Sequence, residues 1–445
     1  MNRELELARA IKNGTLDLIC PEMELLVCPR YHDVALKGTG VIRADNFARL
    51  FFRMVAPFHG PVHDVLQPSK APGEIYSLTD QVMLRAIDED GREWRSNPLI
   101  VNLSSTIALG NWCIKKKIAS LFHSVTRRES DQSFIQILIP DSPELPFDMA
   151  THCRKTVGDR EVGWASTVDN HVHRIGEAKV TFRCEDDRWL YIAASQPRAF
   201  LPTWPGLLCH ALGFATAQTL RPAVITRHFS AREDLELFSG PFWRFASAMG
   251  GPVRFSDPEG AKDFWRLVEV FFRYIERSED KRLLDELDGI RSGARGSFQT
   301  ACLTLGIGIE SIVKMLLKNE SPTTESSKMV RELTTCVDAW SGDASLKKRA
   351  KGALTRLSEV SAADLMYAWA SRTGTRRKLV DRWKKLRHPK AHGKYLNEEQ
   401  IGYDLYFSSL ELLYRIVASA VGYDGPIVPT SQRGWTDTNS TKEDE

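Results

Sequence analysis

Arg387 and His392 are the strongest candidates in this sequence for a reactive pair of side chains. They stand five positions apart in the stretch 386–394. A histidine side chain exchanges a proton near neutral pH, and an arginine side chain stays charged and can contact two phosphate oxygens. Metal-independent RNA cleavage needs a base for the ribose 2′-hydroxyl, an acid for the leaving 5′-oxygen and cations for the phosphate. The two residue types are thus compatible with chemistry on a phosphodiester, and the hypothesis of Arg387 as phosphate clamp and His392 as acid or base depends on the helices around them and on the resemblance given below.

A basic helix is expected to position this pair. Leu379, Trp383 and Leu386 recur at helical spacing within the region 372–394, which also holds ten Lys or Arg and one acid. Such a helix would bury one apolar face and leave a cationic face exposed. Because the residue before a proline is disfavoured in the α conformation, we expect the helix to end just before Pro389.

Several neighbouring cations are expected to support the pair. The expected RNA contacts are Lys384, Lys385 and Lys390, and the expected secondary contacts are His388 and Lys394. A second basic run, 347–356, would extend this surface along a phosphate backbone, although basic runs usually form solvated helix faces. The alternative for Arg387 and His392 is that they only cap a helix end, where positive charge offsets the helix dipole.

Two apolar stretches flank the basic helix in the sequence. Residues 298–317 predict an apolar helix that carries Glu310, and residues 403–421 predict another. Together with the Arg-polar-x-x-x-His motif, this order resembles the HEPN family (higher eukaryotes and prokaryotes nucleotide-binding) over roughly residues 260–423. The resemblance implies a metal-independent endoribonuclease that acts as a homodimer, with the Arg and His of the motif as its active-site pair.

The acid on the first apolar helix has an expected role as well. A buried carboxylate needs a partner, and we expect Glu310 to orient Arg387 or a neighbouring basic group. A salt bridge inside a helical bundle is compatible with that role. We therefore treat Glu310 as a supporting residue and not as a catalytic one.

The order of the whole chain resembles that of ApeA-type HEPN anti-phage proteins, in which a large β-rich region precedes a C-terminal HEPN domain. The resemblance implies defence by abortive infection, with RNA as substrate and tRNA as one candidate. The N-terminal domain would then sense a phage protein or restrain the nuclease. No cofactor and no metal are expected at the Arg387 site.

The bulk composition is that of a globular protein with an ample core. The chain has 445 residues, of which 42% are hydrophobic and 26% charged, and its net charge is only +3. Nucleic-acid affinity must therefore come from local patches. The chain has eight scattered cysteines without a C-x-x-C pair, and we expect no signal peptide, so a cytoplasmic protein is favoured. It has no long uncharged apolar run, so we expect no membrane span.

The expected fold class is α+β multidomain: a β-rich N-terminal domain followed by an all-α HEPN four-helix bundle with a helical insertion. We assign residues 1–250 to the first domain, 257–425 to the second and 430–445 to a disordered tail. The expected strands are 34–42, 99–103, 134–139, 179–184 and 189–193, the last two as a hairpin, and the expected helices of this half are 46–54 and 207–220.

Helical periodicity dominates the second half of the chain. The expected helices are 261–277, 298–317, 327–340, 345–360, 362–371, 376–387 and 397–421. The helices at 327–340, 345–360 and 362–371 stand between the apolar helix of Glu310 and the basic helix. They therefore look like an insertion into the bundle.

The sequence contains other candidate sites, which suggest alternative functions. His171 and His173 would place two imidazoles on one face of a strand, as a metal pair would require. The arrangement of Glu177 and Lys179, with Asp159 or Asp169 upstream, is similar to the motif of metal-dependent nucleases of the PD-(D/E)xK type. One alternative function is therefore a metal-dependent nuclease centred on Glu177 and Lys179. The other is a non-catalytic HEPN module that binds nucleotide or RNA or dimerises. Gly306 and Gly308 lack the third glycine of a dinucleotide-binding loop, and we expect them inside a helix.

Overall fold

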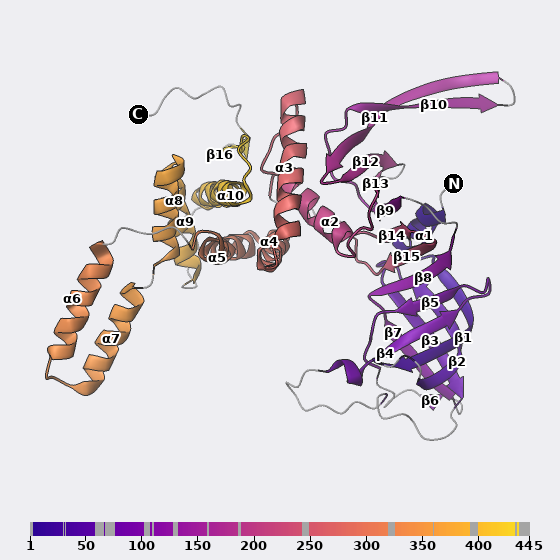
Figure 1. The fold of residues 1–445 in the computed structure, drawn as a ribbon, viewed down its shortest axis with the longest axis horizontal. Helices are drawn as coiled ribbons and strands as arrows, with labels where there is room; N and C mark the ends of the chain where they lie inside the picture. The colour runs from indigo at the N-terminus through magenta and orange to yellow at the C-terminus, as the bar shows by residue number, and fades with distance from the viewer. Residues whose placement is uncertain are drawn as a thin grey trace. The chain divides into compact units, whose positions relative to one another are not determined.

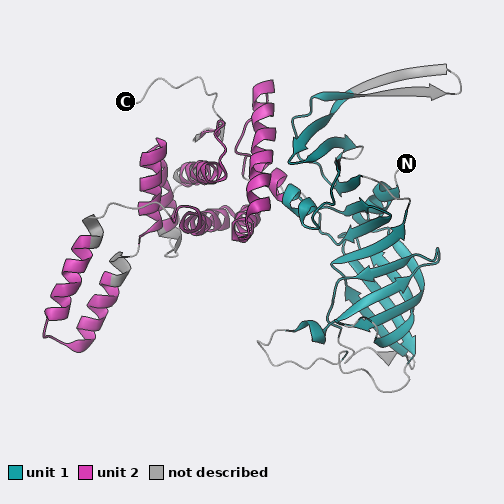
Figure 2. Ribbon diagram, in the orientation of Figure 1, with its two compact units in different colours: residues 1–209, 220–245 teal, residues 210–219, 246–445 magenta. Residues whose placement is uncertain are grey.

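The computed structural model divides the chain into two compact units (Figure 2). The β-rich unit comprises residues 1–209 and 220–245, and the helical unit comprises residues 210–219 and 246–445. The structure describes residues 3–29, 31, 33–57, 66, 76–101, 107–108, 111–127, 132–157, 160–185, 188–242, 249–318, 325–358, 360–391, 399–431 and 434–435. The backbone alone is described in parts of these ranges, including 151–157, 160–166 and 388–391.

One antiparallel sheet forms most of the β-rich unit (Figure 1). Its neighbours follow the order β10-β11-β12-β13-β9-β14-β15-β8-β5-β4-β1-β2-β3-β7-β6. The strands are β1 Asp17–Val27, β2 Val34–Ala44, β3 Leu50–Pro57, β4 Val82–Ile87, β5 Glu93–Ser96, β6 Ile107–Ala108, β7 Asn111–Lys117, β8 Ser120–Thr126, β9 Ser133–Ile139, β10 Met149–Val157, β11 Arg160–Ile175, β12 Ala178–Glu185, β13 Trp189–Gln196, β14 Val224–Phe229 and β15 Arg232–Phe238.

The alternation of buried and exposed side chains explains this sheet. Along β12, Ala178, Val180 and Phe182 are buried while the residues between them are not. β12 pairs with β13 as the predicted hairpin, and the predicted strands at 34–42 and 134–139 are confirmed as β2 and β9. The helix α1 Arg3–Lys12 packs on β14, β2 and β9, and its Ala8 and Ile11 join the core of the sheet.

One prediction in this unit, the helix 46–54, was wrong, and another, the strand 99–103, falls partly on residues outside the described ranges. The segment 46–54 is not a helix, because Asp45 holds a turn through its hydrogen bonds to Phe47 and Arg49 and β3 begins at Leu50. Of the predicted strand 99–103, Leu99 forms a single bridge to Val82, and residues 102–103 lie outside the described part. The apolar residues of β3 fit both a helical and an alternating period, and pairing with β2 and β7 decides for the strand.

The helical unit contains the following helices, of which α2 begins in the β-rich unit. They are α2 Trp204–Ala215, α3 Pro258–Arg277, α4 Arg282–Gly293, α5 Phe298–Leu316, α6 Glu325–Ala339, α7 Ala344–Ser358, α8 Ala362–Thr373, α9 Arg377–Ala391 and α10 Glu399–Val421. The seven helices predicted in this half are confirmed within a few residues at their ends. The helix α4 was not predicted, and the predicted helix 207–220 is shifted toward the N-terminus.

Local signals account for where several helices start. Asp257 caps α3 by accepting a hydrogen bond from the backbone of Gly260, and Pro258 occupies the first turn. Ser361 and Asp364 form a capping box at the start of α8, and Gly374 ends that helix with a positive φ of 70°. The end of α8 at Gly374 separates it from α9, the helix that carries Arg387.

The helices α5, α9 and α10 contact one another, and α3, α4 and α8 pack around them. Their shared core contains large buried side chains such as Trp369, Tyr406 and Tyr414. The helices α6 and α7, two of the three expected in the insertion, lie side by side in Figure 1 and stand in the sequence between α5 and α8. The third helix expected there, α8, instead packs against α5 and α9. The chain thus has a β-rich N-terminal part and an α-helical C-terminal part, as expected.

The helix α9 differs from the prediction at its end. It continues through Pro389 to Ala391 instead of ending before the proline. A proline within a helix removes one backbone hydrogen bond, and the last turn has the fewest such bonds to lose. The tail expected to be disordered contains two short paired strands, β16 Thr430–Ser431 and β17 Gly434–Trp435, while residues 436–445 lie outside the described part.

No helix among the described residues is both long and apolar enough to cross a membrane. Of the described cysteine side chains, none forms a disulfide, and Cys20, Cys28, Cys209 and Cys302 are buried. These thiols therefore belong to the apolar cores of the two units.

Candidate functional site

The contact of α9 with α5 determines where Arg387 lies. The predicted apolar stripe of Leu379, Trp383 and Leu386 is buried, at 4%, 3% and 0% exposure. The indole Nε1 of Trp383 donates a hydrogen bond of 3.1 Å to the backbone oxygen of Gly306 in α5. At Gly306 a Cβ atom would lie 3.5 Å from the Cα of Arg387, so the two helices approach closely at this level. Gly306 and Gly308 lie inside α5, as expected.

Glu310, one turn further along α5, binds Arg387. Arg387 Nε donates to Glu310 Oε2 at 2.6 Å, and Arg387 Nη2 lies 2.5 Å from the same oxygen. Lys314 Nζ lies 3.0 Å from the other oxygen, Oε1. The contact expected between Glu310 and Arg387 is therefore present, and each carboxylate oxygen has a cationic partner.

This contact orients the guanidinium of Arg387 and leaves some of its N–H donors free of Glu310. The Nε and Nη2 side of Arg387 points at Glu310, while Nη1 takes no part in that ion pair. The side chain of Arg387 is 31% exposed and that of Glu310 is 22% exposed. A guanidinium has five N–H donors, so Arg387 can hold Glu310 and still contact a phosphate oxygen.

The two cations also set the protonation of Glu310. Burial alone would raise the pKa of this carboxyl, but the hydrogen bonds from Lys314 and Arg387 outweigh it and hold the pKa below its ordinary value of 4.5. Glu310 is therefore charged throughout the neutral range, and the ion pair stays intact there.

The other predicted site residues are described to different extents. His388 and Lys390 lie on the backbone of α9, and nothing is described of their side chains. His392 and Lys394 lie outside the described residues, and α9 ends at Ala391, directly before His392. Lys385 is exposed, and the Lys384 ammonium lies 5.6 Å from the centre of the Tyr367 ring. The structure thus brings Arg387 and Glu310 together.

Part of the basic run on α9 serves the packing of the helical unit. Arg376 and Arg415 both contact Glu411 of α10, at 3.4 and 2.8 Å, and the side chain of Glu411 is only 1% exposed. Arg382 donates to the hydroxyl of Ser408 at 2.7 Å. Sequence reasoning missed Glu411, although its signal, an acid within an apolar helix, is the one that pointed to Glu310.

The second basic run, on α7, is likewise divided between packing and exposure. Lys347 donates to the backbone oxygen of Asp338 at 2.6 Å, and Lys351 pairs with the Asp338 carboxylate. Lys348 and Arg349 are exposed. Some cations of this run therefore join α7 to α6, and only the exposed ones could contact an anionic partner.

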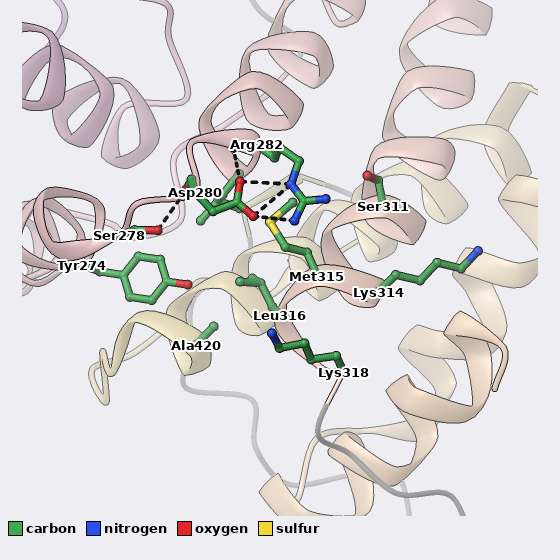
Figure 3. Close-up of a pocket in the computed structure, with 11 residues that line it drawn as sticks. Tyr274, Ser278, Asp280, Arg282, Ser311, Lys314, Met315, Leu316, Lys318 and Ala420 are labelled. Atoms are coloured by element: carbon green, nitrogen blue, oxygen red, sulfur yellow. Dashed lines mark hydrogen bonds and ion pairs between the residues drawn. The ribbon is translucent and has the colours of Figure 1, made fainter. Parts of the chain in front are cut away.

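A cavity of about 550 Å³ lies at the ends of α3, α4, α5 and α10 (Figure 3). The hydroxyl of Tyr274 and the ammonium of Lys318 point toward the middle of the group drawn there, whereas the ammonium of Lys314 points away. Asp280 and Arg282 pair with each other at its rim. Neither Arg387 nor Glu310 lines this cavity, so we do not assign it to the Arg387 site.

The histidine pair lies as predicted, on one face of β11. The rings of His171 and His173 stack with centroids 5.8 Å apart, and His171 Nδ1 lies 2.8 Å from an oxygen of Asp148. Among the described residues, no group of three or more His, Cys, Asp and Glu is arranged to hold a metal ion. The pair therefore has a structural partner in Asp148 and no metal site is assigned to it.

Asp169 lies too far from Glu177 to complete the alternative metal-dependent nuclease site of Glu177 and Lys179. Glu177 lies at the turn closed by the pair Ile175 and Ala178, and Asp169 lies six residues before Ile175 on β11. At ~3.3 Å per residue, Asp169 is about 20 Å from the turn, too far to share a metal with Glu177. Asp159 lies outside the described residues.

A comparison of this chain with protein-family models, with curated proteins and with solved structures found no match.

Proposed function

We propose that the helical unit is a metal-independent endoribonuclease of HEPN type, with Arg387 and His392 at its active site. The observation that supports the proposal is the ion pair of Arg387 with Glu310 on a neighbouring helix. It holds a partly exposed guanidinium at the end of α9, and His392 follows that end in the sequence. An oriented, permanently charged guanidinium suits the charge that develops on a phosphate during transfer.

The residues divide the chemical work as follows. His392 removes the 2′-hydroxyl proton or protonates the leaving 5′-oxygen, and Arg387 binds the non-bridging phosphate oxygens. The attacking 2′-oxygen forms a bond to phosphorus as the bond to the 5′-oxygen breaks, which leaves a cyclic phosphate and a free 5′-hydroxyl. One histidine serves as only one of the two proton-transfer groups, so we propose that a homodimer supplies the second from a second copy.

The wider role is proposed from the resemblance to HEPN proteins of the ApeA type. The substrate would be RNA, with tRNA as one candidate, and the setting would be anti-phage defence by abortive infection. The β-rich unit would then restrain the nuclease until a phage protein is present. Lys384, Lys385, Lys390, His388 and Lys394 are the proposed supporting contacts to RNA.

Cleavage of single-stranded RNA in EDTA tests this function. We expect the wild-type chain to cleave and His392→Ala to be slower by about 10²- to 10⁴-fold, the usual contribution of general acid–base catalysis. Arg387→Ala should lose activity as well. Arg415→Ala is the matched control, because Arg415 is 32% exposed, pairs with Glu411 and lies in the same unit.

Four results would contradict the proposal in different ways. Equal cleavage by wild type and His392→Ala would remove the assigned catalytic residue. Loss of wild-type activity in EDTA would point to a metal-dependent nuclease. A dimer that binds RNA without cleaving it would make the unit a binding module, and a protein that is monomeric at its active concentration would exclude the shared site.

A further inference from the structure

We propose that the outer face of β3 and β7 in the β-rich unit binds single-stranded nucleic acid. This face, called here the β3–β7 face, consists of Phe51, Arg53 and Val55 on β3 and Cys113, Lys115 and Lys117 on β7. The side chains that alternate with them, including Phe52, Met54 and Ile114, are buried in the core. The proposal concerns a different unit from Arg387 and does not depend on the proposed nuclease.

Strand register brings the cations of this face together. Arg53 lies directly opposite Lys115, and Phe51 lies directly opposite Lys117. All three cations are exposed, and within the described part of the chain none of them forms an ion pair with a carboxylate. Like charges directly opposite each other destabilise a strand pair, so an anionic partner would relieve this repulsion.

The neighbouring strands show how the same sheet otherwise neutralises its cations. Glu24 on β1 lies 3.2 Å from Lys37 and 2.8 Å from Arg85, and Arg85 also lies 3.0 Å from Glu93. Arg43 on β2 pairs with Asp17 at 2.8 Å. The β3–β7 face therefore carries the excess positive charge beside a region in which cations and carboxylates pair.

Apolar side chains lie among these cations. Val55 is 37% exposed, and Ile19, which reaches the same face across Val41, is 49% exposed. The Lys115 ammonium lies 4.6 Å from the centre of the half-buried Phe51 ring. Cations with interspersed aromatic and aliphatic groups on an open sheet suit phosphates and unstacked bases together, which is the chemistry of a single strand.

A duplex and an acidic protein fit this face less well. A duplex presents its phosphates and keeps its bases stacked inside, so Ile19 and Val55 would face no base. An acidic peptide would supply charge, but the cation–π contact and the exposed apolar side chains among the cations favour the planar rings of bases. The probe is therefore a fluorescent 12-nucleotide 2′-O-methyl oligonucleotide, which cannot be cleaved by attack of a 2′-hydroxyl.

The test compares two double variants of the full-length chain by fluorescence anisotropy. Arg53→Gln with Lys115→Gln removes the opposed cations of the β3–β7 face. Arg174→Gln with Lys179→Gln is the matched control, because these exposed residues also lie directly opposite each other, at the β11–β12 turn. The like-charge pair is thus common to both sites, and the apolar surroundings together with Lys117 distinguish the β3–β7 face.

We expect the Arg53/Lys115 variant to bind about 10-fold more weakly or worse and the control to bind within about 2-fold of wild type, measured at low salt. The slope of log affinity against log salt should fall by about 1.4 in the first variant, since each phosphate contact on a single strand contributes about 0.7. Thermal unfolding should show both variants folded.

Equal weakening in the two variants would show that affinity follows net charge alone and would overturn the proposal. Absence of wild-type binding, or equal affinity for a 12-base-pair duplex, would overturn it too. Binding of the probe in a chain that fails to cleave RNA would leave this proposal intact and reject only the nuclease, so the two failures are distinguishable.

Discussion

At the scale of single residues, Glu310 determines the state of Arg387. Its two oxygens hold two different cations, Arg387 from α9 and Lys314 from its own helix. A charged carboxylate with both oxygens in ion pairs favours one orientation of the guanidinium beside it. The ionised form of Glu310 therefore fixes the orientation of the Arg387 side chain.

The first prediction concerns the pH dependence of stability. Because the pKa of Glu310 is lowered on folding, its contribution to stability is fully present above the ordinary pKa of 4.5 and is lost as pH falls through the folded pKa. Glu310→Gln should remove that contribution. We expect the melting temperatures of wild type and Glu310→Gln to differ near neutral pH and to converge as pH falls below 4.5 and through the folded pKa.

The same variant should cleave RNA on the order of 10- to 100-fold more slowly at pH 7, because the guanidinium loses its anchor. Glu269→Gln is a control for both measurements, since Glu269 pairs with the exposed Arg273 on α3. A melting curve for Glu310→Gln that keeps the wild-type acid dependence would show that this carboxylate is not responsible.

At the scale of elements, two glycines of α5 allow close approach on two sides. Gly306 faces Arg387 of α9, and Gly308 faces Ile290 of α4. A Cβ at residue 306 would meet Arg387 at an ordinary 3.5 Å, whereas a Cβ at residue 308 would lie 2.6 Å from the side chain of Ile290. The helix therefore needs a glycine on its α4 side and only tolerates one on its α9 side.

The second prediction follows from this difference. Gly308→Ala should destabilise the protein by about 1–3 kcal/mol, because Ile290 must move within a packed interface. Gly306→Ala should be neutral or stabilising by up to about 1 kcal/mol, since alanine favours the helix and meets no clash. Urea unfolding measures both free energies. A larger loss for Gly306→Ala than for Gly308→Ala would contradict the described packing of α5.

At the scale of the whole molecule, the two units do not divide the chain at one point. Residues 210–219, which follow the sheet strands β1–β13 in the sequence, belong to the helical unit. Phe214 of α2 stacks on Phe271 with ring centroids 4.6 Å apart and meets Tyr414 edge-on at 5.8 Å. Its side chain is buried, so the core of the helical unit includes a residue from the first half of the chain.

The third prediction is that Phe214→Ala destabilises the helical unit. Loss of a buried phenylalanine costs about 3–5 kcal/mol, and its contacts lie on α3 and α10. Hydrogen exchange should therefore increase in peptides of α3, α5 and α10 and change little in β9 and β13. Phe182→Ala, at a fully buried position of β12, is the control with the opposite pattern. Loss of protection in β9 and β13 alone would contradict the assignment of Phe214.

The elements with local signals could be predicted from the amino-acid pattern alone. The helices of the second half follow from apolar residues at helical spacing, as in Leu379, Trp383 and Leu386, and the β12–β13 hairpin follows from alternation around a polar turn. The prediction of a helix at 46–54 was wrong because the apolar residues there fit both the helical and the alternating strand period. The local pattern therefore could not distinguish a helix from a strand.

Contacts between residues far apart in the sequence depend on how the elements pack. Glu310 and Arg387 are 77 positions apart, and the need of a buried carboxylate for a partner suggested their pairing, but the packing of α5 on α9 produces it. The opposition of Arg53 and Lys115 depends on strand register, and the place of Phe214 depends on which core its helix reaches. Periodicity specifies which face of an element is apolar, but the partner of that face is selected by packing across the whole chain.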